Sequence, residues 1–194
     1  MLLALLLILV GCDSANSVRK LPRPEIEYPP ANLPASLHQE NWASKQRDTL
    51  GQGSCVHASS TNMFRWHNMF EFGEEWRAEN HGGEYDSRLM RKLDAKGIKY
   101  VYTQKADPRF LDWVSETRRA APLWFKPSHC CLFLGWCEKD GRQYAAILDP
   151  NRPGKIELTP REQFVRLWAG YGGFAYTILN PPAPQLTWPS YEVL

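Results

Sequence analysis

The sequence predicts an α+β domain in which an N-terminal helical part packs on an antiparallel β-sheet. Segments with helical patterns dominate the first part of the chain, and short segments rich in β-branched and aromatic residues follow them. A chain of 194 residues with 43% hydrophobic side chains can bury one sizeable core. We therefore expect one folded domain, with its functional cleft between the helices and the sheet.

The first predicted helix covers residues 55–69, which contain no proline or glycine, and Ser54 is its candidate N-cap. A second helix is predicted at 85–97, where apolar side chains recur at helical spacing and Gly97 forms the stop. Two more helices are predicted at 107–120, with a proline in the first turn, and at 159–170.

Five strands are predicted, at 98–103, 122–126, 129–138, 143–150 and 173–179. The stretch "EKDGR" predicts a hairpin with a three-residue loop that ends at Gly141. Counting back from that loop places His129 opposite Asn151, with Asp149 two residues away on the same face. A two-residue loop would turn both of these side chains to the other face.

The two ends of the chain differ from its centre. The run "MLLALLLILVGC" is too short to span a bilayer, which needs about 20 residues, but it suits a secretory signal. It resembles a bacterial lipobox, although no basic residue precedes it, and the resemblance implies an exported lipoprotein anchored to the cell envelope through lipidated Cys12. The expected organisation is a signal at 1–12, a proline-rich tether at 13–36, the folded domain at 37–180 and an extended tail at 181–194.

Charge and cysteine usage exclude several functions. The net charge is +2 and the basic residues are scattered, which argues against a nucleic-acid partner. None of the five cysteines lies in a cluster with zinc spacing, so the sequence predicts neither a structural metal nor another cofactor. Without Cys12 and a catalytic Cys55 the remainder is odd, which favours a reactive thiol over a disulfide framework.

Cys55 is the candidate nucleophile because it follows "GQGS" and begins the first predicted helix. A thiolate is the reactive form of cysteine, and a helix N-terminus stabilises it through the helix dipole and free backbone N–H groups. The same N–H groups and the side-chain amide of Gln52 could form an oxyanion hole.

The base that such a thiol needs is assigned to His129, which opens an apolar strand at the edge of the expected cleft. Either Asp149 or Asn151 could accept the imidazole N–H and orient the ring towards Cys55. The other four histidines are expected to be structural or solvated: His38, His57, His67 and His81.

The sequence resembles the papain-like cysteine peptidases, within them the branch of the bacteriocin leader (double-glycine) peptidases. The resemblance rests on "QGSCVHAS", "HCCLFLGW" and "YAAILDPN", between about residues 45 and 180. It implies a papain-like fold, a peptide or protein substrate, Cys55 as nucleophile, His129 as base and Asp149 as the orienting residue. It also implies that Gln52 completes the oxyanion hole. The hairpin count favours Asn151 as the orienting residue whereas the resemblance favours Asp149, so Asn151 ranks second.

Two alternatives stay open at this point. "QGSC" also resembles the stretch before the papain nucleophile, where its cysteine forms a disulfide; Ala58 would then occupy the nucleophile position. Under that alignment the protein would be an inactive surface lipoprotein that binds a partner. Within the enzyme class, a cell-wall amidopeptidase or a transglutaminase-like acyl transferase could use the same triad.

Overall fold

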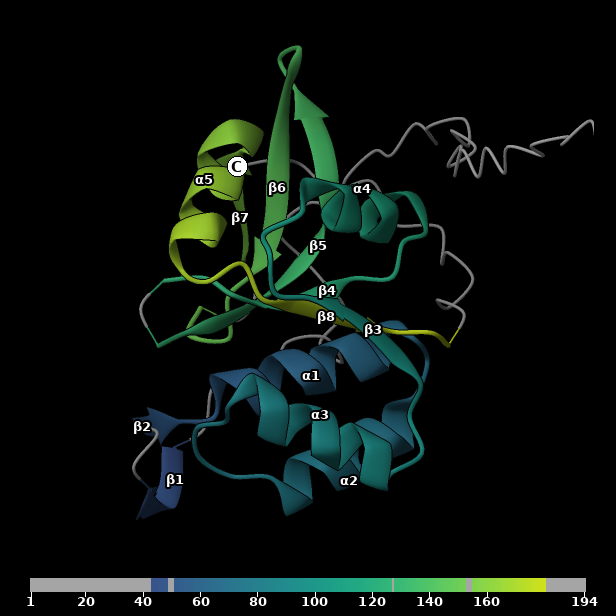
Figure 1. Ribbon diagram of the computed structural model, residues 1–194, viewed down its shortest axis with the longest axis vertical. Coiled ribbons are helices and arrows are strands. Elements are labelled where there is room, and N and C mark those ends of the chain that lie inside the picture. The colour runs from purple at the N-terminus through teal and green to yellow at the C-terminus, as the bar shows by residue number, and fades with distance from the viewer. Residues whose placement is uncertain (1–42, 49–50, 127, 153–154, 181–194) are drawn as a thin grey trace, which may run out of the picture.

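The computed structural model describes residues 43–48, 51–126, 128–152 and 155–180 (Figure 1). The predictions for the signal with Cys12, the tether, the C-terminal tail and the start of the folded domain lie outside these ranges. Within them, no helix has both the length and the apolar composition that a membrane crossing requires.

Three helices form the helical part below the sheet in Figure 1: α1 (Cys55–Trp66), α2 (Phe70–Glu79) and α3 (Asp86–Ala95). The predicted helix at 55–69 is too long, because the backbone turns left-handed at Asn68, with a φ of 61°, and α2 begins two residues later. Ser54 stands before α1 but does not cap it; its Oγ accepts a hydrogen bond from the Gly82 N–H at 2.9 Å. A small antiparallel ribbon, β1 (Ala43–Asp48) and β2 (Gly51–Gly53), precedes α1.

The main sheet has six antiparallel strands in the order β3-β8-β4-β5-β6-β7. Their bounds are β3 (Tyr100–Thr103), β4 (Ala121–Trp124), β5 (Cys130–Lys139), β6 (Arg142–Leu148), β7 (Ile156–Pro160) and β8 (Ala175–Ile178). Two helices complete the described part of the chain, α4 (Pro108–Glu116) and α5 (Arg161–Gly170). The predicted α+β class is confirmed, whereas the sequence patterns did not indicate α2 or β7.

The β5–β6 hairpin differs from the prediction at its loop. Lys139 pairs with Arg142, so the loop has two residues, and both Asp140 and Gly141 have positive φ angles of 51° and 70°. This is the geometry of a type I′ turn, whose twist suits a tight hairpin. A β-bulge between Phe133 and Gly135 then adds one residue to β5 and shifts the register back.

Each face of the sheet has its own core. On one face, Cys130, Leu132 and Leu148 pack with residues of α1 and α3. On the other face, the alternate residues Cys131 and Phe133 pack with side chains of α4 and α5. The sheet is therefore a middle layer, and the N-terminus of α1 reaches it where β5 begins.

Candidate active site

Cys55 is the first residue of α1, which is buried along most of its length. Small polar side chains let this helix approach the sheet closely, and Ser59 Oγ donates to the Cys130 carbonyl at 3.2 Å. The Cys55 side chain is 7% exposed, and no disulfide forms among the cysteines that the structure describes. Ala58 is fully buried. Its backbone N–H donates to the Ser54 carbonyl, one helical turn earlier. The side chain of Gln52 lies outside the described residues.

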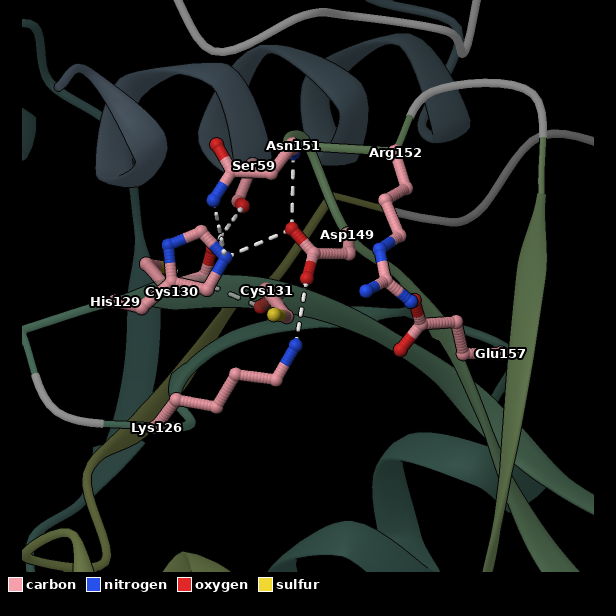
Figure 2. A network of polar contacts seen from close by, with 9 residues as sticks. All are labelled: Ser59, Lys126, His129, Cys130, Cys131, Asp149, Asn151, Arg152 and Glu157. Carbon is pink, nitrogen blue, oxygen red and sulfur yellow. Dashed lines mark hydrogen bonds and ion pairs between the residues drawn. The ribbon is translucent and has the colours of Figure 1, made fainter.

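His129 lies directly before β5 and points its imidazole towards the loop after β6 (Figure 2). Its Nε2 is 2.7 Å from Asp149 Oδ1. Because Nε2 faces the carboxylate, Nδ1 is the ring atom that remains for a thiol. The imidazole side chain is 10% exposed, so it is largely shielded from water.

Asp149 follows β6 and its carboxylate accepts hydrogen bonds from three directions (Figure 2). Besides His129, the backbone N–H of Asn151 donates to Oδ1 at 2.9 Å and Lys126 Nζ donates to Oδ2 at 2.9 Å. The Asp149 carbonyl also accepts from the Arg152 N–H at 2.8 Å, which closes a turn. The "DPN" stretch therefore forms a turn and places a carboxylate beside His129 at the same time.

Both candidate orienting residues contact the imidazole, at different distances. The Asn151 side-chain nitrogen lies 3.5 Å from His129 Nε2, compared with 2.7 Å for the Asp149 carboxylate. The Asp149 carboxylate can accept a charge-assisted bond from Nε2–H, whereas the Asn151 amide nitrogen is a donor and cannot accept from it. Asn151 also holds Asp149 through its backbone N–H.

Electrostatics at the site favour charged forms of His129 and Asp149. Burial alone would lower the pKa of His129, but its hydrogen bond with Asp149 and its interactions with the Cys131 and Cys55 thiols raise it well above the ordinary value of 6.5. Burial alone would raise the pKa of Asp149, but its bonds with His129, Lys126 and Asn151 hold it far below 3.8. The structure thus joins His129 to the Asp149 carboxylate at 2.7 Å, and the imidazole also interacts with the Cys55 thiol.

Two residues at the site were not indicated as site residues by the sequence. Lys126 pairs with Asp149 from the turn before His129, and Cys131 follows His129 by two residues. His129, Cys131 and Asp149 each offer a ligand atom to a metal ion, and these atoms lie within 4.8 Å of one another. Linear spacing could not reveal this cluster, because Asp149 joins it from the neighbouring strand.

The other described histidines lie in structural contacts, as expected. His57 is fully buried, with its Nε2 3.5 Å from Glu84 Oε2. His67 Nε2 contacts the Arg119 carbonyl at 2.6 Å, and His81 contacts the Ala78 carbonyl at 3.0 Å.

Comparisons with known proteins find similarity at the level of structure. No protein-family model matches the chain, and no curated protein sequence matches it. The chain is similar to a solved structure described as the crystal structure of a double glycine motif protease from an AMS/PCAT transporter in complex with the leader peptide. The TM-score is 0.49 at 17% sequence identity, over 73% of this chain and 92% of that chain.

Proposed function

We propose that the protein is a cysteine peptidase that cleaves peptide bonds through an acyl-enzyme. The observation that carries the proposal is the 2.7 Å bond between His129 Nε2 and Asp149 Oδ1, on an imidazole that also interacts with Cys55. A thiol at a helix start, a buried histidine and a carboxylate that orients it are the three parts of nucleophilic catalysis.

In the proposed reaction, His129 Nδ1 takes the Cys55 proton and the thiolate sulfur attacks the carbonyl carbon of the scissile bond. The carbonyl oxygen becomes an anion, which the first N–H groups of α1 and the Gln52 amide would stabilise. The imidazolium returns its proton to the amine, the C–N bond breaks and the thioester remains. His129 then deprotonates a water molecule, which attacks the thioester carbon. The bond between this carbon and the Cys55 sulfur breaks, and the acid product is released.

Asp149 holds the ring in this scheme. Its buried carboxylate accepts a hydrogen bond from Nε2–H and stabilises the imidazolium that forms after proton transfer. We assign the orienting role to Asp149, because its contact with the ring is 0.8 Å shorter than that of Asn151 (3.5 − 2.7 Å). Asn151 supports the carboxylate through its backbone N–H.

The alternative of an inactive binding domain requires Ala58 at the nucleophile position and a disulfide at Cys55. Cys55 carries no disulfide to another described cysteine, and its thiol interacts with the histidine. These observations favour Cys55 as nucleophile. A peptidase, a cell-wall amidopeptidase and an acyl transferase would all use the same Cys55 thiol. The test of that thiol therefore comes first for all three.

The test is the pH dependence of iodoacetamide labelling, with modified sites mapped by mass spectrometry. We expect Cys55 to react at neutral pH, where an ordinary thiol, with a pKa of about 8.5, is mostly protonated. His129→Ala should slow Cys55 labelling at pH 7 by roughly tenfold or more. Burial raises the pKa values of Cys130, Cys131 and Cys137, so these thiols should react slowly in both proteins.

A matched control is His81→Ala, which removes an exposed histidine outside the site. It should leave Cys55 labelling unchanged. Equal and slow labelling of Cys55, Cys130, Cys131 and Cys137 in the unmodified protein would reject the peptidase and leave the binding domain as the better proposal.

We further propose that the protein is exported and anchored through Cys12. Support comes from the apolar run that ends in "LVGC". Metabolic labelling with a palmitate analogue in a bacterial host should modify the full chain and not its Cys12→Ala variant; equal labelling would refute the anchor.

A further inference from the structure

Three side chains of different chemistry meet where β5 begins and β6 ends. His129, Cys131 and Asp149 offer a nitrogen, a sulfur and an oxygen atom, all within 4.8 Å of one another. These are the three ligand types that zinc takes in proteins. The proposed hydrolase uses His129 and Asp149 but gives no role to Cys131, although its thiol interacts with the same imidazole.

Neighbouring strands hold the cluster in place. The β5–β6 ladder includes the pair Leu132 and Leu148, and continuing it by one residue places Cys131 opposite Asp149. Cys131 is fully buried, and the side chains of His129 and Asp149 are 10% and 2% exposed. The carboxylate is further fixed by the Asn151 N–H, so the ligands are prearranged rather than gathered from mobile loops.

We propose that His129 Nε2, Cys131 Sγ and Asp149 Oδ1 bind one zinc ion, and that the bound ion inhibits the peptidase. The inhibition rests on the proposed function, whereas the zinc binding does not. In the form that accepts the Cys55 proton, the His129 ring is neutral with its proton on Nε2. Zinc binding at Nε2 moves this proton to Nδ1 and releases the thiol proton of Cys131 to solvent. With Nε2 on the metal, the neutral ring carries its proton on Nδ1. No lone pair then remains to accept the Cys55 proton, so the general base is lost.

Lys126 limits the affinity of this site. Its ammonium is 2.9 Å from Asp149 Oδ2, which leaves Oδ1 for the metal but adds a positive charge nearby. The Lys126 side chain is 42% exposed, so water weakens its repulsion of the ion. Lys126→Met should therefore bind zinc a few-fold more tightly than the unmodified protein.

The test measures metal binding directly, with zinc chloride in competition with a chromophoric chelator and with cobalt chloride as a spectroscopic probe. We expect one ion per chain and a thiolate-to-cobalt charge-transfer absorption. Both should persist in Cys55→Ser and in the control Cys137→Ser, which changes a buried cysteine at the other end of β5. Cys131→Ser should lose the absorption and bind zinc at least about 100-fold more weakly, more than the loss of an outer-shell partner.

Equal binding by Cys131→Ser would remove Cys131 from the ligand set and overturn the proposal, as would the lack of one bound ion per chain. If Cys131→Ser does not fold, the zinc affinity of Asp149→Asn is measured instead. An affinity equal to that of the unmodified protein would overturn the proposal. Metal-free labelling of Cys55 tests the peptidase separately. Zinc binding with an unreactive Cys55 supports the metal site alone, and a reactive Cys55 with no zinc binding supports the peptidase alone.

Discussion

Asp149 is buried, and its carboxylate is held by an imidazole, an ammonium and a backbone N–H. A buried carboxylate is costly unless such donors satisfy it, and here they favour its ionised form. The hairpin count and the resemblance of "YAAILDPN" indicated Asp149 from the sequence. The Lys126 contact could not be predicted, because it depends on positive φ angles at Lys126 and Ser128 (77° and 54°) that turn this loop back to the carboxylate.

Lys126→Met is expected to destabilise the fold slightly. The pair with Asp149 has one exposed partner, so its coupling should be about 0.2–1 kcal/mol, and it should weaken as salt rises. A double-mutant cycle with Asp149→Asn, followed by urea unfolding, measures that coupling. Lys126→Arg keeps the charge and should retain most of the stability. Zero coupling at low salt would contradict the ion pair.

At the scale of elements, the β5–β6 hairpin shows why the site could be predicted in spite of a wrong loop. The expected three-residue loop has two residues, which by itself would turn His129 and Asp149 to the other face. The bulge between Phe133 and Gly135 adds one residue to β5 and restores the expected register. The two deviations cancel at the site. Asp140-Gly141 is a local signal for the two-residue loop, whereas the bulge is visible only in the register of the folded sheet.

The segment between α2 and α3 is tied to α1 by a buried charge. Glu84 Oε2 is 2.5 Å from Lys92 Nζ and 3.5 Å from His57 Nε2, with its side chain 1% exposed. Burial alone would raise the pKa of Glu84, but its contacts with His57 and Lys92 lower it to about 2. Burial lowers the pKa of His57 below 6.5, so that residue is favoured in its neutral form.

Glu84→Gln should therefore lower the free energy of unfolding at pH 7 by roughly 3–5 kcal/mol. The depressed pKa means that Glu84 stabilises the fold fully above pH 4.5 and loses this effect as pH falls towards about 2. His57 likewise stabilises above pH 6.5 and loses its effect below. Urea unfolding between pH 7 and pH 3 should show a steep decline in the unmodified protein and a shallower one in the variant.

The matched control is Glu79→Gln, which breaks an exposed pair with Lys96 at 2.8 Å. It should change stability by no more than about 1 kcal/mol. Similar losses for the two variants would mean that the buried position of Glu84 contributes nothing beyond a surface ion pair.

At the scale of the whole molecule, the candidate site joins two layers. Cys55 comes from the helical layer, while His129 and Asp149 adjoin the ends of sheet strands β5 and β6. Composition and periodicity predicted these layers, because apolar residues at helical spacing and alternating strands are local signals. They could not predict α2, whose position depends on packing of Trp76 and Phe72 against Phe64 of α1.

The contact that aligns the layers at the site is the hydrogen bond from Ser59 Oγ to the Cys130 carbonyl, one turn after Cys55 and next to His129. Ser59→Ala should cost about 1–3 kcal/mol and slow Cys55 labelling in the folded protein, because α1 is no longer fixed to the start of β5. Ser60→Ala provides the comparison, since Ser60 Oγ contacts Tyr176 Oη at 2.6 Å on β8. It should lose similar stability without slowing Cys55 labelling. If iodoacetamide labels Cys55 in both variants as fast as in the unmodified protein, the packing of α1 on β5 does not set the position of the thiol. His129 alone then determines the reactivity of Cys55.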